Sequence, residues 1–135
     1  MKPLEPWAVL LAKAAQDEYV VDTLIDLADS PDEVLGFHLQ QAAEKILKAA
    51  LLSLNVEYRF THNLGELVYL IKKSGCTIPD DLDEIRELTP YATEWRYDFI
   101  PDEGSDILDR NKARDVVARL RVWVEALIKN RPTGG

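Results

Sequence analysis

Arg96 is the residue whose setting most directly suggests chemistry. It lies between Trp95 and Tyr97 in the stretch YATEWRYDF, with Tyr91 and Asp98 close by. A guanidinium group at a helix end can bind a phosphate through paired hydrogen bonds. An arginine flanked by aromatic and acidic side chains can equally be a stacked or ion-paired structural residue. Helical periodicity does not choose between these two interpretations.

A line of polar side chains on an apolar helix is the second candidate. In FHLQQAAEKILKAALL, residues 37–52, the side chains of Gln40, Glu44 and Lys48 recur at every fourth position, so they lie on one line along a helix. Glu44 and Lys48 by themselves are explained by an ordinary ion pair between successive turns, worth about 0.2–0.5 kcal/mol. Whether these polar side chains also belong to an interface or a binding site depends on the residues around them on the helix.

The same helix is apolar on almost every side. One arc forms an ordinary core face, made of Leu35, Leu39, Ala42, Ala43, Ile46 and Ala50. The opposite side carries further large apolar side chains, which a merely solvated face would not need. Such a helix is usually buried twice, once in its own bundle and once against another surface. We therefore predict an interface, most simply of a homodimer or with a docked partner, at Phe37, Gln40, Leu51 and Leu52.

Length and composition are typical of one globular domain. A chain of 135 residues can bury roughly two-thirds of the surface that it exposes when unfolded. We expect a single domain over residues 1–135, with its core in 7–129 and a frayed tail at 131–135. No apolar run approaches the ~18 residues that span a bilayer, and the N-terminus shows no basic leader with an apolar block. We therefore expect no membrane association and a cytoplasmic protein.

Metal and cofactor sites are not expected. The single cysteine, Cys76, excludes an internal disulfide and a cysteine-rich metal site. The sequence also contains no cluster of histidine and cysteine and no Glu-x-x-His pair of the kind found in di-metal helical bundles.

The charge is unevenly distributed. The net charge of −8 would repel nucleic acid from the protein as a whole, but residues 106–135 hold 7 lysines and arginines against 4 acidic residues. Arg110, Arg114 and Arg121 fall on one side of the last predicted helix. This face could bind RNA or an acidic partner, and a solvated, ion-paired helix face is the more ordinary explanation.

Five helical segments position these residues, and no segment alternates as a strand does. The first spans about 6–28, with Glu18 inside its apolar stripe, where a carboxylate needs a partner. The second begins at an N-cap serine, Ser30, followed by Pro31 and Glu33. The third covers about residues 64–74, the fourth begins at 79, and the fifth follows a cap at Asp109. We predict an all-α, up-and-down helical bundle of three long and two short helices, with the long ones antiparallel or nearly so.

Three stretches in this order resemble the HEPN family of small helical domains. They are FHLQQAAEKILKAALL, then THNLGELVYLIKKSG, then YATEWRYDF, and the resemblance covers about residues 7–129. It implies a helical bundle of the four-helix type that dimerises, often encoded in prokaryotes beside a minimal nucleotidyltransferase. Many such pairs act as toxin and antitoxin, and the HEPN member is then a metal-independent ribonuclease.

The activity of that family rests on an arginine followed, after four to six residues, by a histidine at the junction of two protomers. Arg96 matches the arginine, but the corresponding later positions are Pro101, Asp102 and Glu103. The two histidines of the chain are His38 and His62. The resemblance therefore implies a non-catalytic or weakly catalytic module, and the alternative is a toxin ribonuclease that uses Arg96 with His38 or His62 as a non-standard base.

The pocket implied by the resemblance consists of Gln41, Glu44, Lys48, Arg96 and Tyr97. It could bind a nucleotide or present a surface to the nucleotidyltransferase, whereas RNA is the less favoured ligand. A third interpretation is a helical interaction scaffold that binds no ligand, in which substitutions would alter stability alone.

Overall fold

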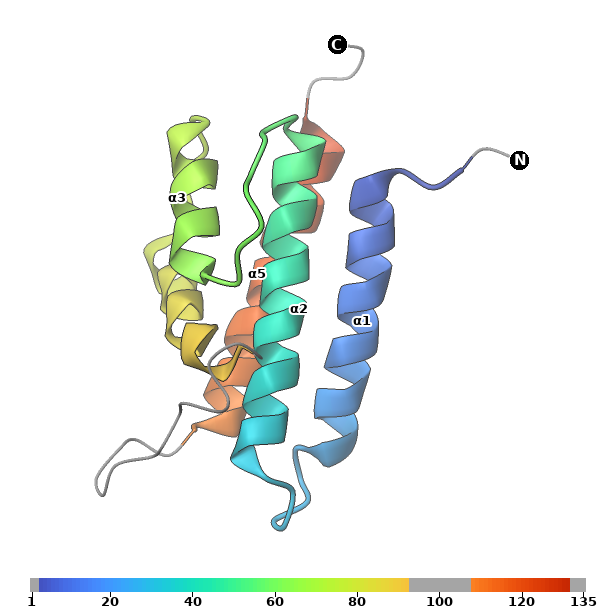
Figure 1. The fold of residues 1–135 in the computed structure, drawn as a ribbon, viewed down its shortest axis with the longest axis vertical. Helices are drawn as coiled ribbons and strands as arrows, with labels where there is room; N and C mark the ends of the chain where they lie inside the picture. Colours follow the sequence, from blue (N-terminus) through green and yellow to red (C-terminus); the bar gives the residue numbers. More distant parts are fainter. Residues whose placement is uncertain (1–2, 93–107, 132–135) are drawn as a thin grey trace.

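The computed structural model describes residues 3–92 and 108–131 of the chain. Within these ranges the regular structure is entirely helical, and Figure 1 shows the elements in chain order: α1 (Pro6–Leu24), α2 (Asp32–Ser53), α3 (Leu64–Lys73), the 3-10 helix η1 (Asp80–Tyr91) and α5 (Arg110–Asn130). The all-α class and the three long and two short helices predicted from the sequence are confirmed.

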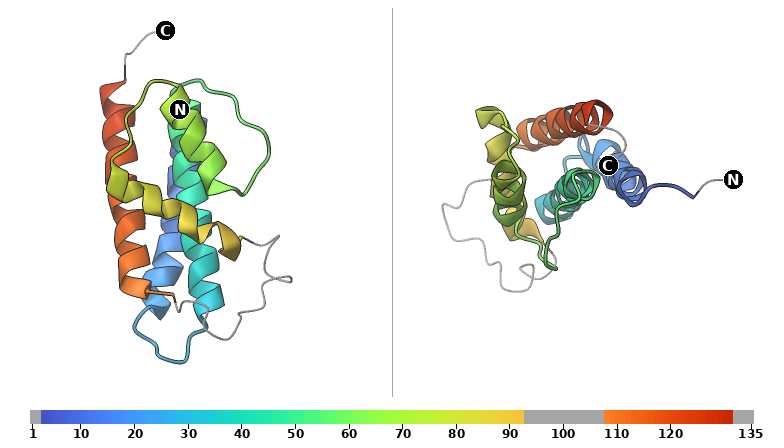
Figure 2. Two further views of the ribbon diagram at one scale, coloured as in Figure 1. Left: turned by 90° about the vertical axis from the view of Figure 1, so that its left-hand side faces the viewer. Right: turned by 90° about the horizontal axis from the view of Figure 1, so that it is seen from above.

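Helix α2 lies in the middle of the bundle. Helix α1 packs along one side of it, α5 along another, and α3 with η1 on a third, as the view from above in Figure 2 shows. The core face predicted for α2 is confirmed, since all six of its members are at most 1% exposed: Leu35, Leu39, Ala42, Ala43, Ile46 and Ala50. Because neighbours surround α2, apolar residues are needed on nearly all of its sides.

Helix α5 does not run antiparallel to α2, as it would in a bundle whose neighbouring helices simply alternate in direction. Helix α1 is antiparallel to α2, as expected, but α5 runs in the same direction as α2 (Figure 1). The segment after α2 first returns along the bundle, and α3 then ascends beside α2 before η1 descends (Figures 1 and 2). Helix η1 thus ends below the middle of the bundle, and α5 begins near its lower end (Figure 1).

The start of α2 corrects one sequence-based prediction. Ser30 is not an N-cap, because the helix begins at Asp32 with Pro31 in the capping position and without a capping hydrogen bond from a side chain. The Ser30 hydroxyl instead donates to the carbonyl oxygens of Leu24 and Leu27, at 2.9 and 2.7 Å. The serine therefore closes the turn after α1, and the acidic Asp32 stabilises the first turn of α2.

Capping residues and glycine set the ends of α3 and the start of α5, as their local sequence indicates. Asn63 caps α3 by accepting a hydrogen bond from the backbone N–H of Glu66, and the expected cap of α5, Asp109, accepts from that of Lys112. Helix α3 ends before Gly75, whose φ of 104° suits glycine. The fourth segment is a 3-10 helix, and the three-residue spacing of its buried Leu82, Ile85 and Leu88 matches the three residues per turn of that geometry.

No helix in the described parts of the chain is both long and apolar enough to cross a lipid bilayer.

Candidate functional site

The predicted polar line on α2 is a connected hydrogen-bond network, which we call the α2 polar cluster: Gln40, Gln41, Glu44, Lys48 and His62. Glu44 is its centre. One carboxylate oxygen accepts from Gln40 Nε2 at 3.0 Å and lies 2.7 Å from His62 Nδ1. The other accepts from Lys48 Nζ at 2.9 Å. The ion pair between successive turns is therefore present, but it is only one part of a larger arrangement.

Two glutamines complete the α2 polar cluster. Gln40 has no exposed surface, and its amide nitrogen also donates to the backbone carbonyl of His62 at 3.1 Å. Its amide oxygen accepts from Gln41 Nε2 at 2.7 Å. Gln40 thus satisfies its own buried amide while it fixes the loop that carries His62 against α2.

Glu44 is held in its ionised form. Burial raises the pKa of Glu44, but hydrogen bonds from His62, Gln40 and Lys48, together with the charge of Lys48, outweigh burial and hold the pKa below its ordinary value of 4.5. An ionised carboxylate can only accept hydrogen bonds, so Nδ1 of His62 carries the proton in this contact. This leaves Nε2 of His62, to which no described residue is hydrogen-bonded, as the second polar atom of the ring.

Aromatic side chains of the loop after α2 lie around Lys48. Its Nζ is 5.6 Å from the ring centroids of both Tyr58 and Phe60, within the range of a cation–π contact. Burial, followed by the negative charge of Glu44, raises the pKa of Tyr58 above 10.0. Phe60 is 78% exposed and meets the edge of His62 at a centroid distance of 5.0 Å. The α2 polar cluster therefore lies beneath a ring that is open to solvent.

A second carboxylate–histidine pair lies between α1 and α2. Asp17 is buried and accepts from His38, whose Nδ1 is 2.9 Å from Oδ1, while Lys45 donates to the other oxygen. Both histidines of the chain therefore have Nδ1 on a carboxylate. His38 lies on the α1 side of α2 and makes an edge contact with Phe37. The structure does not bring it into the α2 polar cluster.

The basic side chains of the last helix serve the fold. Buried Glu18, for which a partner was required, pairs with Arg121 through Nε at 2.9 Å and through Nη2, and with Arg114 at 3.4 Å. Arg114 also binds Asp22, and the charge and hydrogen bonds of its acidic partners, Asp22 foremost, raise its pKa. The solvated, ion-paired interpretation of this face is the one that the contacts support.

Arg110 has a comparable structural role. Its guanidinium group donates to Asp32 at 2.8 Å, to the backbone carbonyls of Ile25, Leu27 and Ser30, and to the Ser30 hydroxyl. It thereby joins the start of α5 to the turn between α1 and α2. These arginines are committed to contacts within the chain rather than presented to RNA.

The predicted interface divides into two pairs of residues. Leu51 and Gln40 have no exposed surface within a single chain, so both belong to its interior and neither can contact another protein in this conformation. Phe37 and Leu52 are partly exposed. The apolar character of α2 arises mainly because α1, α3, η1 and α5 enclose it, a possibility that helical periodicity does not distinguish from an external partner.

Arg96 and Tyr97, the other predicted members of the pocket, lie outside the described residues, as does the tail from 132 onward. The described members of that pocket, Gln41, Glu44 and Lys48, are connected through Gln40 in one network. The residues that sequence analysis did not assign to this pocket are Gln40, Tyr58, Phe60 and His62. For the three loop residues among them, the sequence feature that could have indicated the site is the occurrence of two aromatic residues and a histidine in the short loop NVEYRFTHN.

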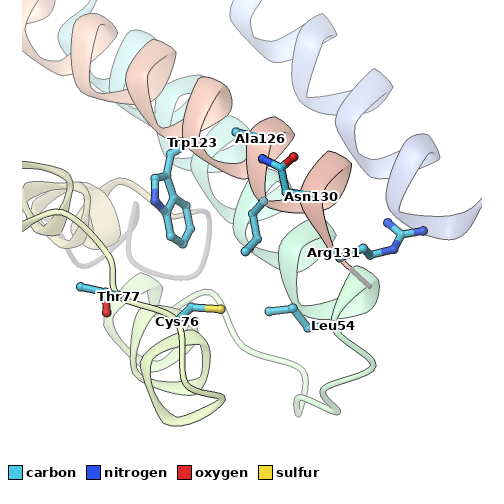
Figure 3. Close-up of a pocket in the computed structure, with 8 residues that line it drawn as sticks. Leu54, Cys76, Thr77, Trp123, Ala126, Asn130 and Arg131 are labelled. Atoms are coloured by element: carbon cyan, nitrogen blue, oxygen red, sulfur yellow. The ribbon is translucent and has the colours of Figure 1, made fainter. Parts of the chain in front are cut away.

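A separate pocket lies at the far end of the bundle. It has a volume of about 490 Å³ and is lined by residues from the ends of α2 and α5 and from the link between α3 and η1. Figure 3 shows Trp123 extending toward Cys76 and Thr77, with Leu54 and Arg131 at the other side. None of the predicted site residues that the structure describes contributes to its lining.

Comparison with known proteins gives one family. A family model described as HEPN domain matches residues 17–130, a range that includes α2, α3, η1 and α5 completely and the second half of α1. The same comparison finds no matching curated protein and no matching solved structure.

Proposed function

This chain belongs to the HEPN domain family, and we propose that it is a non-catalytic or weakly catalytic member that binds a nucleotide at the α2 polar cluster. We further propose that it is a homodimer and docks on a minimal nucleotidyltransferase, in a pair of the toxin–antitoxin kind. The observation that carries nucleotide binding is that Lys48 and His62 share the buried carboxylate of Glu44. The ammonium group of Lys48 can donate to a phosphate, and His62 can do so through Nε2 when that nitrogen also carries a proton.

The chemistry of the cluster suits a phosphate. The ammonium group of Lys48 has three donors, of which Glu44 takes one, and its side chain is 12% exposed. His62 is 18% exposed, with Nδ1 occupied by Glu44. The carboxylate holds both groups in place, so little side-chain entropy remains to be lost on binding. Arg96 and Tyr97 are the further members that we propose for this pocket.

Calorimetric titration with AMP and ATP tests nucleotide binding. We expect Lys48→Met to weaken the affinity at least about tenfold, as the loss of one charge-assisted contact implies. Lys45→Met is the matched control, because Lys45 belongs to the same helix but has its ammonium group on Asp17. An absence of binding by the wild-type protein at millimolar nucleotide would refute this part of the proposal.

The proposed association uses the partly exposed residues of α2. Phe37 and Leu52 place apolar surface at the edge of the helix, where a second copy or the nucleotidyltransferase could cover it. We expect Phe37→Asp and Leu52→Asp to dissociate the homodimer in sedimentation and to abolish co-purification with the nucleotidyltransferase. Val122→Asp is the control, because Val122 is 68% exposed on α5. If both α2 variants remained fully associated, this surface would be excluded.

One observation favours a second candidate function, a metal-independent ribonuclease. The imidazole of His62 is oriented by a buried carboxylate at 2.7 Å, the arrangement by which many enzymes hold a general base. In this candidate Arg96 would stabilise the charged transition state. Cleavage of RNA in the presence of a chelator, lost in both Arg96→Ala and His62→Ala but retained in His38→Ala, is its required signature. If none of the proteins cleaves RNA, the binding function alone remains.

A further inference from the structure

We propose that Phe60 is a platform on which an unpaired nucleobase stacks while Lys48 and His62 hold the attached phosphate. The inference rests on the proposed nucleotide-binding function and adds a base-recognition element from the loop between α2 and α3. The ligand class is a nucleobase joined to a phosphate, either in a free nucleotide or in single-stranded RNA.

The exposure of Phe60 is the first observation. At 78%, Phe60 is the most exposed large hydrophobic side chain among the described residues. A phenyl ring left in water forgoes the stabilisation that burial would supply. The ring is nevertheless not in a loosely held position, because the residues on both sides of it are fixed.

The residues that flank Phe60 anchor the loop. Before it, Arg59 binds Glu66 through two hydrogen bonds of 2.6 and 2.8 Å. After it, Thr61 is buried, and its hydroxyl oxygen accepts from the backbone N–H of Asn63 at 3.0 Å. His62 is held by its ring on Glu44 and by its carbonyl on Gln40. The ring is thus presented from a fixed loop, which lowers the entropic cost of stacking.

The position of Lys48 and His62 relative to the ring is the second observation. Lys48 Nζ is 5.6 Å from the centroid of Phe60, and the ring of His62 is 5.0 Å away. An aromatic ring beside cationic or hydrogen-bonding groups is the combination by which proteins bind unpaired bases, with the ring against the base and the cations against the backbone phosphate. For Tyr69, also exposed, no comparable cation contact exists among the described residues.

The test compares AMP with ribose 5-phosphate, which carries the same phosphate but no base. Calorimetric titration should show the wild-type protein binding AMP roughly 5- to 150-fold more tightly, the range expected when one base stacks on an aromatic side chain. Phe60→Ala should remove this preference, and Phe60→Trp should retain it. Tyr69→Ala is the matched control, since it removes another exposed ring, and Tm should be close to that of wild type for Phe60→Ala.

The possible results distinguish a failure of the stacking proposal from a failure of the proposed nucleotide-binding function. If wild type bound AMP and ribose 5-phosphate equally, or if Phe60→Ala kept the preference for AMP, the stacking platform would be excluded while phosphate binding stood. If wild type bound neither compound nor RNA, the nucleotide-binding function itself would fail. A single-stranded RNA hexamer that binds more tightly than AMP, and more tightly than its duplex, would identify RNA as the source of the base; equal binding of hexamer and AMP would identify a free nucleotide.

Discussion

The ring of Tyr91 lies directly on the backbone of α2 at Gly36. A Cβ atom built at position 36 would come within 2.2 Å of Tyr91 Cδ1, a distance that real Cβ atoms do not tolerate. The contact fixes the last residue of η1 against the start of α2. A glycine inside a long helix is otherwise unfavourable, so close packing explains its presence here.

Gly36→Ala is therefore expected to destabilise the protein. Alanine is the better helix former by about 1 kcal/mol, but forcing a methyl group into the Tyr91 ring costs up to about 3 kcal/mol. We expect a net loss of about 1–2 kcal/mol in the free energy of unfolding, measured by urea denaturation. Gly65→Ala is the control, because its Cβ would meet only side-chain atoms, Arg86 Cδ and the capping oxygen Asn63 Oδ1, both at 3.2 Å, where a shift of a few tenths of an ångström relieves the contact. Equal effects of the two substitutions would contradict the proposed role of the Tyr91 contact.

The stability of the protein should depend on the ionisation of Glu44. Its pKa is lower in the folded than in the unfolded chain, so the unfolded chain takes up the proton first as the pH falls. Glu44 therefore stabilises the fold above about pH 4.5, and this contribution is lost as the pH falls toward the folded-state pKa. Urea denaturation between pH 3 and 7 should show that the stability difference between wild type and Glu44→Gln is largest near neutrality and shrinks in acid. A difference that is independent of pH would count against this account.

Glu18 should matter for stability because it is buried between two arginines. Arg121→Ala leaves that carboxylate without its closest partner, and we expect a loss of about 2–3 kcal/mol in the free energy of unfolding. This is less than the ~3–5 kcal/mol of a fully buried pair, because Arg121 is about one-fifth exposed. Arg119→Ala on the same helix removes only exposed pairs with Asp81 and Asp115 and should leave Tm close to that of wild type. Comparable losses in the two variants would exclude a special role for Glu18.

Arg110 should not be replaceable by lysine. Its planar guanidinium group reaches a carboxylate, three backbone carbonyls and a hydroxyl, which a single ammonium group cannot satisfy together. We expect Arg110→Lys to lower Tm by several degrees in thermal unfolding. The same change at Arg119 is its control, and an unchanged Tm for Arg110→Lys would show that only the positive charge matters.

Local patterns in the sequence predicted most of the fold. Apolar spacing identified the buried face of α2, and the cap residue Asp109 placed the start of α5. These features depend on neighbours within one or two turns, which a sequence displays directly. Ser30 was misassigned because its hydroxyl makes contacts backward along the chain to Leu24 and Leu27 instead of forward into the helix.

The candidate site was only partly predictable, because its members meet through the path of a loop. Helical spacing could place Gln40, Glu44 and Lys48 on one line, but nothing local shows that the loop returns His62 to Glu44. Likewise, periodicity shows that Leu51 must be buried without showing whether the covering surface belongs to the same chain. The structure shows that it does.

The partners of Glu18 have a consequence for the order in which the protein can fold during synthesis. The arginines that neutralise this carboxylate lie 96 and 103 residues later in the chain, on the last helix. When α1 and α2 have left the ribosome, α5 has not yet been made, so the Glu18 carboxylate is still hydrated rather than paired with an arginine. The pairing of Glu18 is therefore completed only after α5 has been translated, so this contact between the first and last helices forms late in synthesis.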